Sequence, residues 1–426
     1  MRKLVDIWRY MLLAGGLAVL PLQAQLLQPL PSLPFAHFER NVLQMDDSLC
    51  LERFFSRLDT LIFYGRGDVR VMHIGGSHVQ AGVMTQQLRD HLLALSEDLM
   101  GGPYFVFPFS AGKTNTPAHY RVTYTGDWLL SRSAVVKPEN RRMGLAGVAV
   151  TTSDTAATFS VVTRPRTESP SAPSYTFDTV TVLGYTEAGQ AEPVIRWNAD
   201  TVIRAERRAD DPFFHFRLPV RTDSIRVAME GLPGTFTVTG ILLDNGRHGL
   251  SLQGIGANGA KVSSYLLCED FERDLALIKP DLVIFGIGIN DAVDTQFSKH
   301  RFKEDYDMLI SKIRIVSPDC ELLFITNNDS YRRVRAGRYQ VNRNGRDAEE
   351  AFLEMGRKYG AAVWNQFDIM GGLGSMQQWQ GKGLAQTDKV HFTNTGYQLV
   401  GDLLYNALIT EYVKHVRRLA SNVEEE

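Results

Sequence analysis

The stretch VRVMHIGGSH, residues 69–78, decides the fold of this chain. Its apolar run is typical of a strand, and the two glycines that follow predict a tight turn. Leu88, Leu92, Leu95 and Leu99 then recur at helical spacing. A strand, a turn and a helix in this order place Ser77 at the carboxyl end of a parallel strand, where open α/β sheets bind ligands. Ser77 is therefore a candidate nucleophile, although serine is also a common helix cap.

Asp388 and His391 lie three positions apart near the end of the chain, just before an amphipathic helical pattern. At this spacing one loop can hold a carboxylate against an imidazole, fixing its tautomer and stabilising the imidazolium. We therefore predict that His391 takes the proton of Ser77 and that Asp388 orients His391. For the motif alone, a surface loop with an incidental Asp and His is the alternative.

A second buried strand, residues 280–285, runs into Gly286-Ile287-Gly288-Ile289-Asn290-Asp291. The glycines allow the backbone to approach a ligand closely, and the carboxamide of Asn290 can donate to an oxyanion. The alternative is an ordinary turn asparagine.

Gly254, Gly256 and Gly259 form another glycine-rich loop before a helix. We predict that the backbone N–H of Gly259 is a further oxyanion donor, with Gly256 as the neighbouring candidate. The spacing also matches the dinucleotide fingerprint, but Asp281 opens the next strand where a ribose-binding acid should end it. We therefore predict no nucleotide cofactor, and no cofactor of any other kind.

In these blocks the chain resembles the SGNH/GDSL hydrolase superfamily, over residues 65–104 and 247–415. The resemblance assigns Ser77 as nucleophile and oxyanion donor, Gly259 and Asn290 as oxyanion donors, and Asp388 with His391 as the acid–base pair. The Ser77-His78 pair is similar to the branch that contains peptidoglycan O-acetylesterases and related bacterial polysaccharide acetylesterases and acetyltransferases. One position departs from the family: Gly76 stands where an aspartate usually braces the turn.

The expected fold is α/β, a doubly wound (flavodoxin-like) parallel sheet with an inserted β-sandwich. Residues 25–104 and 247–426 form the hydrolase core, and residues 105–246 form the insertion, because short alternating runs replace helical periodicity there. The insertion is a candidate carbohydrate-binding module or a stabilising flap. We predict that Trp128 binds substrate, with Tyr120, Tyr124 and Tyr185 as further candidates. The alternative is the core, because most aromatic residues in a sandwich belong to it.

Residues 1–24 read as a signal peptide, with a basic start, an apolar run and Leu22-Gln23-Ala24 as the cleavage site. Removing them takes away three positive charges and one negative charge, so the net charge changes from −2 to about −4. We expect an exported protein, periplasmic or secreted, with no stable membrane anchor. Without a basic stripe we expect no nucleic-acid partner, and we predict no particular oligomeric state.

Cys50, Cys268 and Cys320 are too few for a disulfide framework, which leaves one bridge or three unpaired thiols. No metal-binding spacing is present, so no metal is predicted. A loop near residues 332–338 contains four arginines, for which we favour a solvated charged face over contact with an anionic glycan.

We therefore predict a serine esterase that removes O-acetyl groups from a bacterial cell-wall or other polysaccharide through an acyl-enzyme on Ser77. The alternatives are an O-acetyltransferase that uses the same machinery and a catalytically silent glycan-binding protein. Gly76 is the feature that motivates the silent alternative.

Overall fold

The computed structural model describes residues 25–47, 49–96, 99–137, 140–163, 175–231, 234–335 and 337–424. The expected signal peptide, residues 1–24, lies outside them. Within the described ranges, no helix combines the length and the apolar character needed to cross a membrane.

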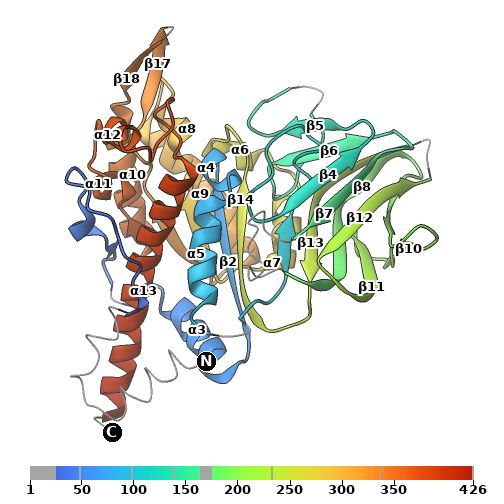
Figure 1. Ribbon diagram of the computed structural model, residues 1–426, viewed down its shortest axis with the longest axis horizontal. Helices are drawn as coiled ribbons and strands as arrows, with labels where there is room; N and C mark the ends of the chain where they lie inside the picture. Colours follow the sequence, from blue (N-terminus) through green and yellow to red (C-terminus); the bar gives the residue numbers. More distant parts are fainter. Residues whose placement is uncertain are drawn as a thin grey trace.

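A six-stranded, mostly parallel sheet forms the centre of one part of the molecule (Figure 1). In spatial order its strands are β1 (Leu43–Gln44), β19 (Ala362–Trp364), β16 (Glu321–Ile325), β15 (Leu282–Gly286), β2 (Asp68–Gly75) and β14 (Gly249–Gly256). The edge strand β1 pairs antiparallel with β19, and the other five strands are parallel. Counted along the chain, these five follow the spatial order 2-1-3-4-5, which is common in doubly wound α/β proteins.

Helices cover both faces of this sheet because alternate strand residues point to opposite sides. In β2, Val69 and Val71 pack into one hydrophobic cluster, and Met72 and Ile74 pack into another. The first cluster is covered by α3 (Glu52–Tyr64), α5 (Val83–Leu93) and α13 (Asn394–Glu424). The second is covered by α6 (Val262–Leu266), α7 (Phe271–Ile278), α9 (Lys299–Val316) and α10 (Asn344–Tyr359).

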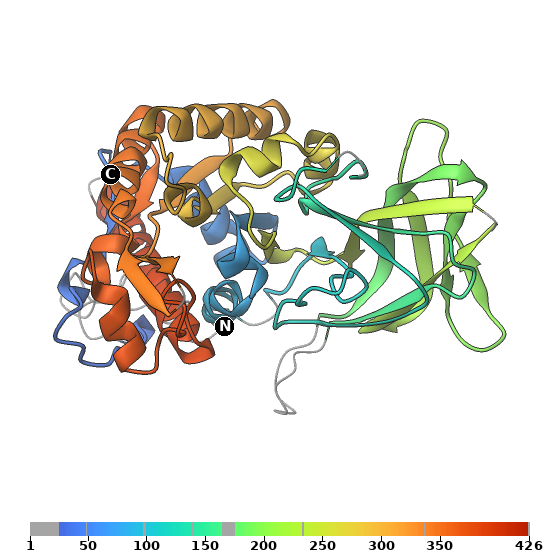
Figure 2. The ribbon, with the colours of Figure 1, turned by 90° about the horizontal axis from the view of Figure 1, so that it is seen from above.

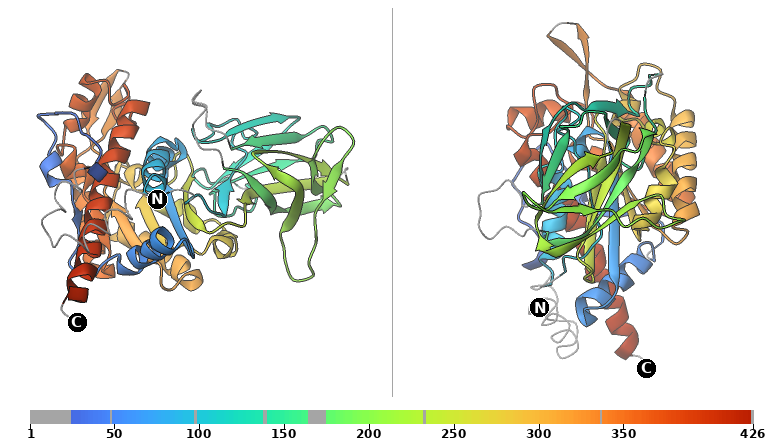
Figure 3. Two further views of the ribbon diagram at one scale, coloured as in Figure 1. Left: turned by 60° about the horizontal axis from the view of Figure 1, so that its bottom comes forward. Right: turned by 90° about the vertical axis from the view of Figure 1, so that its right-hand side faces the viewer.

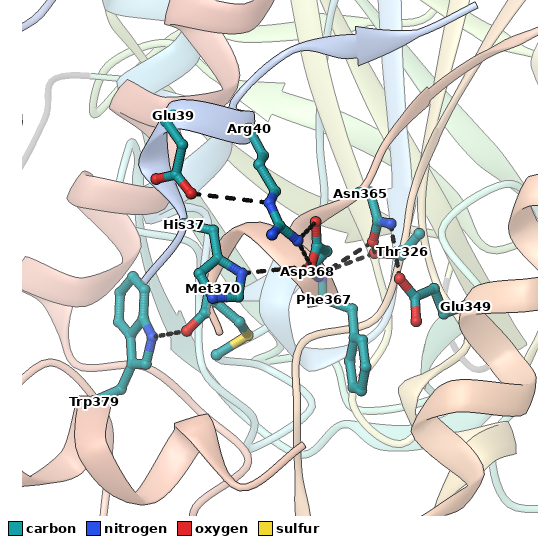
Figure 4. A network of polar contacts seen from close by, with 10 residues as sticks. All are labelled: His37, Glu39, Arg40, Thr326, Glu349, Asn365, Phe367, Asp368, Met370 and Trp379. Atoms are coloured by element: carbon teal, nitrogen blue, oxygen red, sulfur yellow. Dashed lines mark hydrogen bonds and ion pairs between the residues drawn. The ribbon is translucent and has the colours of Figure 1, made fainter. Parts of the chain in front are cut away.

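Short helices follow the carboxyl ends of the parallel strands, where the predicted site residues lie. They are α4 (Ser77–Gln80), α8 (Ile289–Ala292), α11 (Gln366–Ile369) and α12 (Ser375–Gly381). Figure 4 shows the polar network that holds α11 against the 3-10 helix η1 (Phe38–Arg40). Arg40 donates to both carboxylate oxygens of Asp368, and the side chain of Asn365 caps α11 and donates to Glu349. This network fixes the loop that follows α11.

Two antiparallel sheets lie beside the parallel one, to the right in Figure 2. One contains β10 (Val202–Arg204), β9 (Glu192–Arg196), β12 (Ser224–Glu230), β7 (Thr158–Val162) and β4 (Arg121–Thr125). The other contains β11 (Phe214–Thr222), β8 (Phe177–Gly189), β13 (Gly234–Asp244), β6 (Val148–Thr152) and β5 (Leu129–Arg132), and β3 (Tyr104–Val106) pairs with β13. Phe159 of the first sheet and Phe214 and Phe236 of the second are buried in one hydrophobic core.

The chain enters and leaves this antiparallel region at neighbouring points. The backbone N–H of Leu250, in β14, donates to the carbonyl of Leu99 at 2.5 Å, and Met100 pairs parallel with Leu250. Strand β13 is followed almost directly by β14, so the exit leads straight into the parallel sheet.

The arginine-rich segment is a two-stranded hairpin, where the sequence predicted a loop. Strand β17 (Tyr331–Arg335) pairs antiparallel with β18 (Arg338–Val341). Figure 1 and the right-hand view of Figure 3 show this hairpin projecting beyond the carboxyl edge of the parallel sheet. We call it the arm. The sequence did not predict these two strands because neither has an apolar face that a core would cover.

Candidate active site

Three side chains from opposite ends of the chain meet at the carboxyl edge of the parallel sheet. Ser77 is the first residue of α4, directly after β2. Its Oγ lies 2.7 Å from Nε2 of His391, and Nδ1 of His391 lies 2.7 Å from Oδ2 of Asp388. The structure thus brings together all three residues that the sequence selected as nucleophile, base and orienting acid. In this order of contacts, His391 can accept the proton of Ser77 while Asp388 holds its other nitrogen.

The loop of Asp388 is built to keep this carboxylate charged. Oδ1 of Asp388 accepts hydrogen bonds from the backbone N–H groups of Val390 and His391, at 2.9 and 3.0 Å. Partial burial by itself would raise the pKa of Asp388, but the hydrogen bonds from the His391 ring and from these two N–H groups outweigh it and lower the pKa to about 2. Asp388 is therefore ionised at neutral pH and can stabilise an imidazolium at His391.

A second histidine, His78, packs behind His391. The two rings have centroids 5.1 Å apart, and Nδ1 of His78 lies 2.9 Å from the hydroxyl of Tyr397 in α13. Burial, with a smaller effect of the nearby His391, lowers the pKa of His78 to about 3. His78 is therefore uncharged at neutral pH and supports His391 without repelling an imidazolium. The sequence placed His78 next to Ser77 but gave no sign of its contact with Tyr397.

Candidate oxyanion donors surround Ser77. Asn290, at the start of α8, uses one N–H of its carboxamide to bind the carbonyl of Ala260 at 2.9 Å, which leaves the second N–H available. Within the described part of the chain, the backbone N–H groups of Ser77 and Gly259 make no hydrogen bond. Three donors at this edge are thus free to bind a developing negative charge.

Close packing distinguishes the two glycines of the second loop. A Cβ on Gly256 would lie 2.3 Å from the backbone nitrogen of Gln80 in α4, so glycine at this position lets β14 approach the serine helix. Gly259 is exposed, with a φ of +81° that favours glycine. The close packing of Gly256 and the exposure of Gly259 favour Gly259 as the oxyanion donor.

Gly76 adopts a φ of −97° and a ψ of −138°. A Cβ at this position would lie 3.3 Å from Nδ2 of Asn290. The turn before Ser77 therefore faces the Asn290 carboxamide, and a side chain here would contact an oxyanion donor.

The antiparallel region reaches this edge through a polar network that the sequence did not reveal. The carbonyl oxygen of the Gln80 side chain accepts from the N–H of Asn258, and its amide donates to Thr114 and Asn115. Asn258 also donates to Asn115 at 2.7 Å. A Cβ on Gly259 would meet the side chain of Ala134 at 3.7 Å. Two segments of the predicted insertion thus flank the Gly259 loop.

The structure places Trp128, the predicted substrate-binding residue, in a hydrophobic core. Trp128 is only 8% exposed, its ring packs against Phe159 with centroids 5.6 Å apart, and its N–H donates to the carbonyl of Thr125. Tyr120 is also buried, whereas Tyr124 is 38% exposed. Trp128 therefore belongs to the core of the antiparallel region, and little of its ring is free to stack on a sugar.

The three cysteines are free thiols: Cys50 is partly buried, and Cys268 and Cys320 are buried. Across the described residues, no group of three or more His, Cys, Asp or Glu side chains is arranged to hold a metal ion.

Comparisons with known proteins agree with this geometry. Residues 240–399 match the GDSL-like Lipase/Acylhydrolase family model, which spans Gly259, Asn290, Asp388 and His391. No curated protein sequence matches the chain. The solved structure of a peptidoglycan O-acetylesterase superimposes with a TM-score of 0.68 and 19% identity, covering 84% of this chain and 96% of its own.

Two further solved structures align less well. An acetyl xylan esterase, AlAXEase, gives a TM-score of 0.30 at 17% identity, over 37% of this chain and 81% of its own. A family two carbohydrate esterase from Cellvibrio japonicus gives 0.28 at 10% identity, over 74% and 99%. Residues 240–399 thus match the family of GDSL-like acylhydrolases, and the fold of the chain resembles that of a peptidoglycan O-acetylesterase.

Proposed function

We propose that this protein is a serine esterase that removes acetyl groups from the hydroxyls of a bacterial cell-wall or other polysaccharide. The observation that carries the proposal is the continuous contact from Ser77 Oγ to His391 Nε2 and from His391 Nδ1 to Asp388, each 2.7 Å long. A serine, a histidine and an aspartate linked in this way activate the serine hydroxyl for attack on an ester carbonyl.

In the proposed reaction, Ser77 Oγ attacks the acetyl carbonyl carbon while His391 Nε2 takes the hydroxyl proton. The negative charge on the former carbonyl oxygen is bound by the N–H groups of Ser77 and Gly259 and by the Asn290 carboxamide. The tetrahedral intermediate then breaks its bond to the sugar oxygen, which receives the proton from His391. An acetyl group remains on Ser77.

Water resolves this acetyl-enzyme. His391 takes one proton from the attacking water, and a second tetrahedral intermediate forms. Its bond to Ser77 Oγ then breaks, acetic acid leaves, and the proton on His391 passes to Ser77 Oγ. If a sugar hydroxyl attacks in place of water, the same residues catalyse O-acetyl transfer.

A polymeric substrate is favoured by the setting of the site. The side chains of His391 and Asp388 are 33% and 40% exposed, so the site is open at the surface of the molecule. The segments around Asn115 and Ala134 flank the Gly259 loop, so these two segments can contact a long substrate. The peptidoglycan O-acetylesterase that this fold resembles points to the same class of ester. We further propose that residues 1–24 direct export, which N-terminal sequencing of the exported protein will test by a start at Gln25.

The central experiment compares Ser77→Ala with Ser311→Ala, which changes an exposed serine in α9. Both purified variants are assayed on p-nitrophenyl acetate and on an O-acetylated polysaccharide. We expect Ser77→Ala to lose activity by at least about a thousandfold, because loss of a nucleophile removes the covalent route. Ser311→Ala should match the unmodified protein.

Retention of more than about a tenth of the activity by folded Ser77→Ala would show that Ser77 is not the nucleophile. Acetate release and acetylation of an added glycan oligomer are measured in the same assay. Their ratio shows whether water or a sugar hydroxyl is the preferred acceptor.

A further inference from the structure

The arm rises from the same edge of the molecule as Ser77 and is built on the loop that carries His391. The backbone N–H of Tyr331, the first residue of the arm, donates to the carbonyl of Lys389 at 3.1 Å. Lys389 lies between Asp388 and His391 and adopts a φ of +55°. The base of the arm and the acid–base loop are therefore directly joined.

Lys389 is also held by the aromatic residues of the arm. Its Nζ lies 4.9 Å from the ring centroid of Tyr331 and 5.9 Å from that of Tyr339. The pairing of Tyr339 with Arg333 places Tyr331, Arg333 and Tyr339 on one face of the hairpin, because alternate strand residues share a face. This face of the hairpin therefore lies toward the loop that contains Asp388 and His391.

The other side of the base is fixed as well. Asn342, just after β18, donates its side-chain N–H to the carbonyl of Ala292 in α8, the helix of Asn290. Its backbone N–H donates to the carbonyl of Ser330. The arm is thus anchored both to the loop of His391 and to the helix of Asn290, and it projects from a firm base.

The charge of the arm is unusual for a structural hairpin. Arg333, Arg335 and Arg338 are exposed, and none of them forms an ion pair with any residue in the part of the chain described here. Arg335 and Arg338 stand directly opposite each other across the two strands, on the other face of the hairpin from Arg333 and Tyr339. Like charges in directly opposed positions destabilise a strand pair, so this arrangement costs stability that an anion would recover. Guanidinium groups also bind carboxylates in bidentate fashion.

We propose that the arm is a binding site for a carboxylate-bearing stretch of the polysaccharide whose acetyl ester lies at Ser77. This inference rests on the proposed esterase function and adds the charge class of the substrate. The arm and the segments around Asn115 and Ala134 then hold the polymer on opposite sides of the reacting ester. A nucleic acid is disfavoured as occupant because the cationic surface is one short hairpin on a chain of net charge −2.

The experiment uses two triple variants with the same change in charge. The arm variant is Arg333→Gln, Arg335→Gln and Arg338→Gln. The control is Arg66→Gln, Arg247→Gln and Arg314→Gln, three exposed arginines near the amino ends of β2 and β14 and near the end of α9. Both are assayed at low and high NaCl on an O-acetylated, carboxylate-bearing polysaccharide, on neutral acetylated xylan and on p-nitrophenyl acetate.

We expect the arm variant to lose about tenfold or more in kcat/KM on the anionic polymer at low salt, mainly through a higher KM. The loss should shrink as NaCl rises, because salt screens exposed charges. Activity on acetylated xylan and on p-nitrophenyl acetate should stay within about twofold of the unmodified protein. Equal behaviour of the arm and control variants on the anionic polymer would overturn the proposal.

Binding is measured separately in the Ser77→Ala background, by co-sedimentation with the same anionic polysaccharide after its acetyl groups have been removed. Binding that depends on the arm supports the proposal even if the chain shows no esterase activity, so the two proposals can fail independently. Arm-dependent binding that is stronger for single-stranded DNA or for anionic phospholipid vesicles than for the polysaccharide would overturn it.

Discussion

The parallel and antiparallel regions of this molecule use their side chains in opposite ways. In the parallel sheet, β2 and β15 both end at one edge, so Ser77 and Asn290 meet there although they are far apart in sequence. In the antiparallel sheets the large aromatic residues turn inward, and Phe159, Phe214 and Phe236 share one core. The parallel region holds its candidate catalytic residues at one edge of the sheet, and the antiparallel region uses its aromatic residues for packing. Variants in the two regions should therefore fail in different ways.

The largest effect on stability is expected for Trp128→Ala in the antiparallel region. Truncating a buried tryptophan removes packing against Phe159 and leaves a cavity, which costs about 3–5 kcal/mol of unfolding free energy. Urea unfolding measures this change, and Tyr124→Ala, at a residue 38% exposed, is the control with a much smaller effect. The folded fraction of Trp128→Ala should keep its kcat/KM on polymer. Normal stability with a selective loss on polymer would mean that Trp128 does contact sugar.

The counterpart in the parallel region is Asn290→Ala. Loss of one oxyanion donor should lower kcat by about 10²–10³-fold, equivalent to about 3–4 kcal/mol, with a small change in stability. Steady-state kinetics on p-nitrophenyl acetate gives kcat, and urea unfolding gives the stability. A variant that is strongly destabilised but has normal kcat would show that Asn290 serves only to bind Ala260, to which it donates.

Buried histidines give a smaller, pH-dependent comparison. Burial lowers the pKa of His73, in β2, to about 3, and also lowers that of His119, in the segment between β3 and β4, well below its usual value. Below about pH 6.5 the unfolded chain binds a proton at each histidine that the folded chain excludes, so stability falls as pH falls. Below this pH, each of the two histidines lowers the free energy of unfolding by about 1.4 kcal/mol for each pH unit of acidification.

The measurement is the difference between the unmodified protein and His73→Gln or His119→Gln in urea unfolding at pH 7.5 and 5.5. A difference is needed because Asp291, whose pKa burial raises to about 7, stabilises the folded state in the opposite direction. Each variant should lose less stability on acidification than the unmodified protein. An unchanged slope for His73→Gln would mean that His73 is protonated in the folded chain.

The smallest effect is expected for Gly76→Asp, which restores the aspartate that the family carries. A Cβ at this position would lie 3.3 Å from Nδ2 of Asn290, so the aspartate side chain would lie beside that carboxamide. We expect kcat to stay within about threefold of the unmodified protein or to rise, because the aspartate braces the turn before Ser77 in the hydrolases that this chain resembles. Gly76→Ala adds the Cβ without the carboxylate and should not raise kcat. A loss above tenfold for Gly76→Asp alone would show that the turn is adapted to glycine.

The sequence predicted most of the site but little of what supports it. Ser77, Asn290, Asp388 and His391 follow or precede recognisable strands and helices, and the parallel topology brings such positions to one edge. Trp128 could not be classified in advance, because it lies in the connection between β4 and β5, where no periodic pattern indicates which side chains the core covers. The contacts of His78 with Tyr397 and of Lys389 with the arm join residues whose spacing has no pattern. They depend on tertiary packing alone.

The adjacent entry and exit of the antiparallel region also bear on how the chain folds. Strand β2 is synthesised long before either of its neighbours, because β14 and β15 both follow the antiparallel strands. An unstructured loop between Leu99 and Leu250 would make the pairing of β2 with β14 entropically costly. Once the intervening strands have folded, Leu99 and Leu250 are already in contact, so the effective loop shortens to a few residues and pairing becomes easier by about 3 kcal/mol. We therefore expect early folding of the antiparallel region to favour the pairing of β2 with β14, and with it the completion of the edge that carries Ser77.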